Sequence, residues 1–394
     1  MRDRLVLYLN VGHLIDHLLM LIFPTVVLTM SAEMGRPYAE LLPLALGGFI
    51  AFGAGSIPAG WLADRWSRSG MMTVFFLGIG LASILTGLAG SPMAIATGLT
   101  LVGVFAAIYH PVGIAMLVSN RPNVGRALGV NGVFGNVGIA FSALLAGALA
   151  DWIHWRAAFV IPGLAAIAVG VAFALQRPEG LAVRSAAATQ PPRLTRELLL
   201  RIFVVLTVAT IVNGVIFNAT TVSMPKVFDE RLVALTHSTF GVGALVCVVY
   251  LLAAAAQLCV GWLLDRYTVK RVFVPVVALQ VPLLWLAGTT DSWLMIAVAT
   301  AMMFCVFGQI PINDTMIARY TAERWRARAY AVRYVVSFGG SALAVPLIAY
   351  MHASGGGFPA LFGLLAALAL ATFFAALAFP AEASAVPRPA RLNA

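Results

Sequence analysis

Gly60-Trp61-Leu62-Ala63-Asp64-Arg65 recurs about 200 residues later as Gly261-Trp262-Leu263-Leu264-Asp265-Arg266. Each copy follows one long apolar segment and precedes another. Self-similarity at so long a period excludes a small-repeat solenoid and indicates two large homologous halves. Any functional site is therefore expected between these halves.

The composition places the chain in lipid. It has 394 residues, of which 61% are hydrophobic and 10% charged, and its mean hydropathy is +0.95. A spanning helix needs roughly 20 apolar residues, and only helices or closed barrels satisfy every backbone polar group inside a bilayer. The apolar runs lack the two-residue alternation of barrel strands, so they predict helices.

We predict an all-α integral membrane protein with twelve transmembrane helices in two pseudo-symmetric six-helix bundles. The expected N-terminal bundle is residues 1–177, followed by a linker at 178–200, a C-terminal bundle at 201–380 and a tail at 381–394. The predicted spans are 5–30, 38–63, 71–89, 92–119, 125–150, 156–176, 202–225, 238–264, 272–288, 292–318, 328–351 and 358–379.

The net charge of +10 is distributed by loop. Of the 25 basic residues, twenty lie at the termini, in the linker or in alternate loops, and the opposite loops hold Arg36, Arg156, Lys226 and Arg231. This is the positive-inside pattern, and it predicts that both termini and the linker are cytoplasmic. Basic residues are not interleaved with aromatic ones on a surface, which argues against a nucleic-acid partner.

The duplicated loop predicts a conformational latch. A glycine permits close helix approach, and an aspartate and arginines follow at the membrane edge, where the carboxylate can bond an arginine or a helix N-terminus. A purely topogenic loop is the alternative. The expected latch residues are Gly60, Asp64, Arg65, Arg68, Gly261, Asp265 and Arg266.

With this loop the chain resembles the major facilitator superfamily, whose halves each carry Gly-x-x-x-Asp-Arg-x-Gly-Arg between their second and third helices. Ser67 and Thr268 stand where that family's second glycine is expected. Within the superfamily the chain is similar to the fosmidomycin-resistance type of efflux carrier. That similarity rests on His13-Leu14-x-Asp16 with Pro24, on Tyr109-His110-Pro111, and on Gly135-Asn136-Val137-Gly138. The resemblance implies a central cavity lined by spans one, four, seven and ten.

Ionisable groups inside the spans are the candidate site. Each costs about 2.5–3.5 kcal/mol to insert, so its presence indicates a partner or a function. A pair between Asp314 and Arg333 is expected to offset both charges; the alternatives are that Arg333 extends to the membrane interface or that it binds an anionic substrate. The residues proposed for proton coupling or the substrate cavity are His13, Asp16, His17, Tyr109, His110, Asn213, Gln309, Asn313, Asp314 and Arg333.

Two chemistries fit the first-span cluster. His13 and His17 lie one turn apart, with Asp16 between them, so a carboxylate and imidazoles can hold and pass a proton. The same spacing suits a transition metal, with His13, Asp16, His17 and His110 as ligands. A polar cluster that only ties helices together is the third interpretation.

We expect a secondary carrier of the bacterial inner membrane that works by alternating access and exports a small organic molecule or drug by proton antiport. We expect the chain to be a carrier and not an enzyme. Its sequence contains no Walker-type loop, so ATP is not expected to be the direct energy source. The expected partners are a small-molecule substrate, protons and membrane lipids, with no cofactor and a monomeric state. The alternatives are a metal or metal-chelate carrier, and a non-transporting receptor or intramembrane hydrolase.

Overall fold

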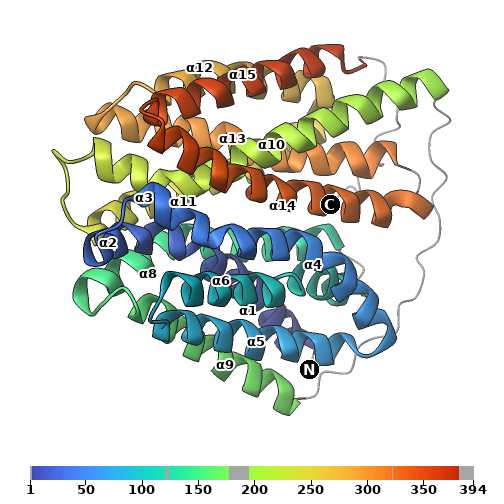
Figure 1. The fold of residues 1–394 in the computed structure, drawn as a ribbon. Helices are drawn as coiled ribbons and strands as arrows, with labels where there is room; N and C mark the ends of the chain where they lie inside the picture. The colour runs from blue at the N-terminus through green and yellow to red at the C-terminus, as the bar shows by residue number, and fades with distance from the viewer. Residues whose placement is uncertain (1, 120–123, 177–194, 322, 381–394) are drawn as a thin grey trace.

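The computed structural model describes residues 2–119, 124–176, 195–321 and 323–380, and every regular element in these ranges is helical (Figure 1). The elements before the linker are α1 (Arg2–Leu21), α2 (Phe23–Met34), α3 (Tyr38–Leu41), η1 (Leu42–Ala45), α4 (Leu46–Arg65), α5 (Arg68–Leu88), α6 (Pro92–Ala106), η2 (Tyr109–Gly113), α7 (Ile114–Val118), α8 (Val124–Trp152) and α9 (Ala157–Gln176). Those after it are α10 (Arg196–Arg231), α11 (Thr239–Arg266), α12 (Val269–Ala287), α13 (Ser292–Tyr320), α14 (Glu323–Ala353) and α15 (Gly357–Ala378).

Twelve stretches in the described residues are long and apolar enough to cross a membrane, which confirms the predicted number. Three of them consist of more than one element: α1 with α2, α3 with η1 and α4, and α6 with η2 and α7. Each break lies beside a proline, at Pro24, Pro43 and Pro111. Proline has no N–H to donate and its ring crowds the preceding turn, so the regular α-helical ladder is interrupted there.

The helices form two groups that lie side by side (Figure 1). Helices α1 to α9 make one group and α10 to α15 the other, and the groups meet where α8 packs on α11 and α4 on α14. We call the end that carries the N-terminus and the α4–α5 connection the linker end. The opposite end, which carries α2, α3 and the α10–α11 connection, is the far end.

The backbones of the two groups approach closely at the far end. A Cβ on Gly147 of α8 would lie 2.4 Å from the Thr239 carbonyl oxygen, and one on Gly243 of α11 would lie 2.2 Å from the Ala143 carbonyl oxygen. Nearer the linker end, a Cβ on Gly132 or Gly261 would meet no atom within 4 Å. Small residues thus allow backbone contact between the halves at one end.

The expected domain bounds stay predictions. Helix α9 ends at Gln176 and α10 begins at Arg196. Residues 178–194 of the expected linker, and the whole expected tail at 381–394, lie outside the described residues.

Candidate functional site

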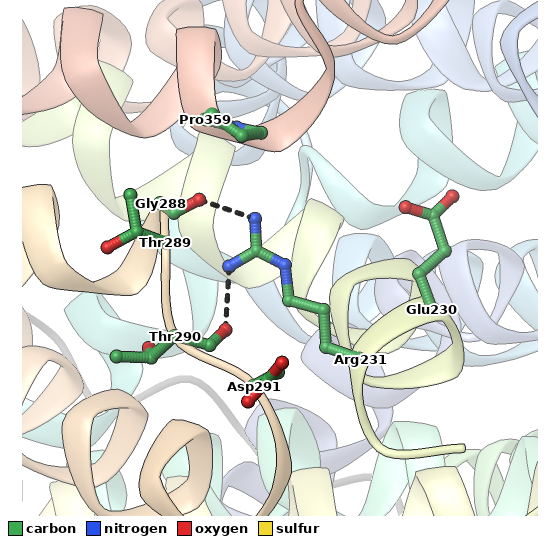
Figure 2. A pocket seen from close by; sticks show the side chains of 7 residues that line it. All are labelled: Glu230, Arg231, Gly288, Thr289, Thr290, Asp291 and Pro359. Carbon is green, nitrogen blue, oxygen red and sulfur yellow. Dashed lines mark hydrogen bonds between the residues drawn. The ribbon is translucent and has the colours of Figure 1, made fainter.

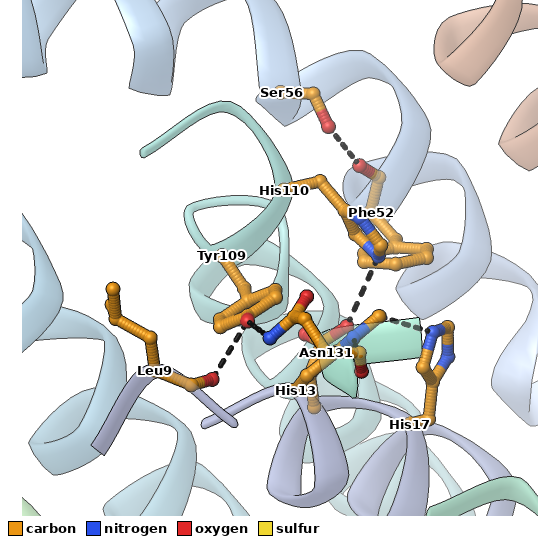
Figure 3. Close-up of polar contacts among 9 residues, drawn as sticks. Leu9, His13, His17, Phe52, Ser56, Tyr109, His110 and Asn131 are labelled. Carbon is orange, nitrogen blue, oxygen red and sulfur yellow. Dashed lines mark hydrogen bonds and ion pairs between the residues drawn. The ribbon is translucent and has the colours of Figure 1, made fainter. Parts of the chain in front are cut away.

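A compact cluster of ionisable side chains lies inside the N-terminal group of helices (Figure 3). His13, Asp16 and His17 come from α1 and His110 from η2, and Figure 3 labels the three histidines. His17 Nε2 lies 3.1 Å from His13 Nε2, and Asp16 Oδ2 lies 3.5 Å from His110 Nε2. Asp16 is fully buried, whereas His17 is partly exposed. The structure therefore brings together the four residues that the sequence suggested.

The fourth span presents His110 on a π-helical turn. Pro111 cannot donate a backbone hydrogen bond, and the chain between Tyr109 and Gly113 widens to a five-residue turn. Such turns often occur at functional sites because they re-aim side chains. The ring of His110 meets the His13 ring edge to face, with centroids 5.2 Å apart.

Asn131 on α8 links the cluster to neighbouring helices, and the sequence analysis did not identify it. Its carbonyl oxygen lies 2.8 Å from His13 Nδ1. Its side-chain amide donates to Asn10 Oδ1 at 3.0 Å and to the Tyr109 hydroxyl at 2.8 Å. Figure 3 shows the second of these bonds. The Tyr109 hydroxyl in turn donates to the Leu9 carbonyl oxygen at 2.7 Å. The signal available in the sequence was an asparagine in a span whose glycines recur at every third residue.

Glycines of α8 make room for α1. A Cβ on Gly135 would lie 2.6 Å from Cε1 of His13, and one on Gly138 would lie 2.3 Å from the Leu14 carbonyl oxygen. The His13 ring also stacks on Tyr109, with centroids 4.9 Å apart and planes inclined by 16°. His13 is therefore fixed between a glycine notch and an aromatic ring.

The predicted residues of the C-terminal half separate into three places. Arg333 of α14 donates to Asp314 of α13, which confirms the expected ion pair. Gln309 of α13 donates a hydrogen bond to Gln280 of α12, so these two side chains lie between the two helices. Asn213 of α10 and Asn313 of α13 are buried.

Comparison with known proteins decides the family. The model of the Major Facilitator Superfamily matches residues 11–249 and 232–394. The chain belongs to this superfamily. As a member of it, the chain is a multi-pass membrane transporter rather than an enzyme.

Solved structures of similar fold are transporters. A bacterial homologue of the human lysosomal transporter Spinster, in an inward-facing and unoccupied conformation, is 16% identical, with a TM-score of 0.76 over 96% of this chain and 94% of that one. The nucleoside transporter NupG is 14% identical, with a TM-score of 0.73 over 95% and 99%. At these identities the likeness extends to the fold.

A curated relative is similar over a shorter stretch. The puromycin resistance protein pur8 of Streptomyces alboniger is 36% identical over 110 residues, which is 27% of this chain. The match spans 22% of that relative's length.

The superfamily loop is built similarly in both halves, including at the two positions that depart from the family pattern. Ser67 Oγ accepts from the Gly70 N–H, and Thr268 Oγ1 accepts from the Arg271 N–H, so each hydroxyl caps the helix that follows. Capping is a role that the expected glycine cannot perform with a side chain, and it stabilises the helix start.

The latch residues lie at the linker end. Asp64 pairs with Arg68 at 2.8 Å, within its own half. Arg65 and Arg266 each lie over a tryptophan one turn earlier, at 4.1 Å and 3.8 Å from the ring centroids. Gly60 faces Pro111, whereas Gly261 meets open space and Asp265 is exposed. A role as a latch stays a prediction.

A hollow of about 430 Å³ opens at the far end of the C-terminal half (Figure 2). Arg231 projects into it and donates to the carbonyl oxygens of Ala287, Gly288 and Thr290. These carbonyls end α12, so the guanidinium caps that helix. Because the guanidinium of Arg231 already donates to these three carbonyl oxygens, we interpret the hollow as part of the helix cap and not as a binding site.

Proposed function

We propose that this transporter exports a small organic molecule or drug in exchange for protons, as carriers of the fosmidomycin-resistance type do. In alternating access, substrate and proton bind in turn in one cavity. The substrate is released in the conformation in which the proton binds, and the proton is released in the conformation in which the substrate binds. The proposal needs a proton-binding group inside the membrane, reachable from the cavity.

The observation that carries the proposal is the Asp16 carboxylate. It is 0% exposed, and neither of its oxygens has a hydrogen-bond donor among the described residues. His110 Nε2 lies 3.5 Å away and His13 and His17 are adjacent. A buried carboxylate without donors is costly when charged, so proton uptake there is coupled to the polarity of its surroundings. The imidazoles provide a route for that proton, because a ring nitrogen of each can accept a proton and pass it on.

The substrate class is inferred from a relative and from the side chains of the second half. The resistance relative suggests an antibiotic as cargo, and the neutral amides of the second half suit a polar or amphiphilic molecule. Puromycin and fosmidomycin are therefore the first compounds to test.

The decisive experiment uses the whole protein in proteoliposomes that contain a pH-sensitive dye. A substrate gradient should drive proton movement in the opposite direction, and an imposed pH gradient should drive substrate accumulation. Asp16→Asn should abolish accumulation driven by the pH gradient, yet spare exchange of labelled for unlabelled substrate, because exchange needs no net proton movement.

Glu40→Gln is the matched control, since Glu40 is an exposed carboxylate paired with Arg36 on the surface. Uphill transport by Asp16→Asn at the parental rate, with unchanged pH dependence between about pH 5 and 8, would move the proton site elsewhere, and Asp314 is the next candidate.

We also propose that the linker end faces the cytoplasm of a bacterial inner membrane. Twenty basic residues favour that orientation by sequence. Topology reporters fused after Arg196 should indicate a cytoplasmic position, and those fused near Glu33 or Asp229 should indicate a position on the external side of the membrane. The opposite result would reverse the assignment of export.

A further inference from the structure

We infer that the three imidazoles of His13, His17 and His110 form a binding site for one divalent transition-metal ion of the Zn²⁺ class. One ligand nitrogen from each of the three residues lies within 4.8 Å of the other two. This inference goes beyond the proposed function, because it concerns equilibrium binding to the resting protein.

The spacing is close to that of a zinc site. Zn–N bonds of about 2.0–2.1 Å in a tetrahedral site place two ligand nitrogens about 3.4 Å apart. His13 Nε2 and His17 Nε2 lie 3.1 Å apart, one helical turn from each other on α1. Small side-chain rotations therefore suffice to bring the third imidazole, on η2, to the same ion.

The hydrogen bonds of His13 leave the correct nitrogen available. The Asn131 carbonyl oxygen, 2.8 Å from Nδ1, accepts only, so Nδ1 carries the proton and Nε2 holds the lone pair. A metal-binding histidine commonly donates its other N–H to a carbonyl in this way, which fixes its ring. In the metal-free protein, the Nε2 lone pair of His13 accepts a hydrogen bond from His17 Nε2. A metal ion replaces that hydrogen bond.

The surroundings hold the ring and balance the charge. His13 lies between the Gly135 notch and the Tyr109 ring, so little side-chain freedom is lost when an ion binds. The Asp16 carboxylate, 3.5 Å from His110 Nε2, offsets part of a double positive charge that burial would otherwise make unfavourable. Because His17 is partly exposed, an ion reaches the site past its ring.

The ligand set selects the ion. Imidazole nitrogens suit Zn²⁺, Ni²⁺, Co²⁺ and Cu²⁺, whereas Mg²⁺ and Ca²⁺ prefer oxygen ligands. Binding of Zn²⁺ but not of Mg²⁺ is therefore the expected signature.

Isothermal titration of the full-length protein in detergent tests the site. The protein used has no polyhistidine tag. It includes the substitution Cys259→Ser, since Cys259 is an exposed thiol that can itself bind zinc. We expect one Zn²⁺ per chain. His17→Gln should weaken binding by at least 10- to 100-fold, the loss typical when even an outer partner of a metal ligand is removed.

Controls separate the site from adventitious binding. His237→Gln changes an exposed histidine in the α10–α11 connection and should bind Zn²⁺ as the parent does. Co²⁺ should give the visible absorption bands of a nitrogen-coordinated ion in the parent and lose them in His17→Gln. Thermal unfolding without metal checks that this variant folds, and His110→Gln provides a second ligand deletion.

The inference is overturned if the parent shows no saturable Zn²⁺ binding, or if both ligand variants bind it with parental affinity. A zinc indicator sealed in proteoliposomes then separates two roles for a bound ion. Zn²⁺ entry abolished by His17→Gln would support the site and make the metal the cargo, against the proposed organic substrate. Binding without entry, with inhibition of drug transport, would support the site and leave the proposed function standing.

Discussion

Charged side chains within the spans of this transporter meet partners on other helices. Asp16 of α1 lies against His110 of η2, and Asp314 of α13 pairs with Arg333 of α14. Each such residue costs about 2.5–3.5 kcal/mol to insert. A partner on a second helix offsets that cost only when the two helices have packed, so these pairs favour the assembled bundle over separate helices.

The Asp314–Arg333 pair is predicted to stabilise the C-terminal half. The side chain of Arg333 is 9% exposed and that of Asp314 37% exposed. Asp314→Asn removes the negative charge that Asp314 places beside the guanidinium, and we expect a loss in the free energy of unfolding of about 1–3 kcal/mol, less than the 3–5 kcal/mol typical of a fully buried pair. Thermal unfolding of the purified protein in detergent measures the change.

The double variant Asp314→Asn with Arg333→Gln is the control for that prediction, because it removes both charges and leaves none uncompensated. It should recover much of the lost stability. Equal losses in the single and double variants would mean that the charges contribute separately and do not act as a pair.

At the scale of elements, helix α8 positions the cluster that α1 carries. Its glycines differ in environment along the helix: Gly135 and Gly138 touch α1, whereas a Cβ on Gly129 or Gly132 would meet open space. The turns of α8 at Gly135 and Gly138 are therefore packed tightly enough to fix a histidine, whereas the preceding turns leave room at their glycines.

Gly135→Ala should displace the His13 ring, because the added Cβ would lie 2.6 Å from Cε1 and 2.7 Å from Nε2 of that ring. We expect a loss of transport of about tenfold or more, with the membrane-inserted protein still folded, since a misplacement near 1 Å can cost up to a hundredfold. Transport in proteoliposomes measures it.

Gly132→Ala is the matched control on the same helix, one turn away and with open space around its Cβ position. It should transport at the parental rate. Equal behaviour of the two variants would show that the seating of His13 does not matter for transport.

The sequence predicts the spans well and their interruptions poorly. Twelve apolar segments are visible because insertion depends on average hydropathy. The break at Ile22, between α1 and α2, and the widened turn at Tyr109 depend on local packing around Pro24 and Pro111, and a proline alone does not specify the form of the break. Asn131 was missed for a related reason, since a neutral amide in a span gains meaning only from the groups that surround it.

At the scale of the whole molecule, the two halves are joined by polar contacts at the far end. Lys226 of α10 lies 5.8 Å from the centre of the Tyr38 ring of α3, and that ring lies 5.3 Å from the His352 ring of α14. His352 in turn approaches Glu230 at 2.8 Å. Alternating access requires the contacts of Tyr38 with Lys226 and His352, which cross between the halves, to break when the far end opens, so they set part of the balance between the two conformations.

The four basic residues of the far end are all held by partners. Arg156 donates to the carbonyl oxygens of Gly87 and Ala89, as Arg231 does at the end of α12. Lys226 pairs with Asp229 and Glu230, and Arg36 lies 3.9 Å from Glu40. The exceptions to the positive-inside pattern are thus explained by structure, as two helix caps and two ion pairs.

Asp151 gives the sharpest test of the closed far end. Its Oδ2 accepts a hydrogen bond from the Phe240 N–H at 2.7 Å, so a carboxylate of α8 meets the N-terminus of α11 in the other half. A charge at a helix N-terminus contributes about 0.3–1 kcal/mol. Asp151→Asn keeps an acceptor oxygen and removes the charge, and it should therefore raise the population with an open far end by about two- to five-fold.

Spin labels report that population directly. Met93 lies in the first turn of α6 and Trp293 in the first turn of α13; both are exposed, and one lies in each half at the far end. In a variant without Cys247, Cys259 and Cys305, cysteines placed at these two positions give one distance distribution for each protein. A longer component should grow in Asp151→Asn, and Glu40→Gln, an exposed carboxylate within one half, should leave the distribution unchanged. If the distance distribution is also unchanged in Asp151→Asn, the Asp151–Phe240 hydrogen bond forms when the far end closes but does not stabilise the closed conformation. The equilibrium between the two conformations would then depend on the contacts of Tyr38, Lys226 and His352.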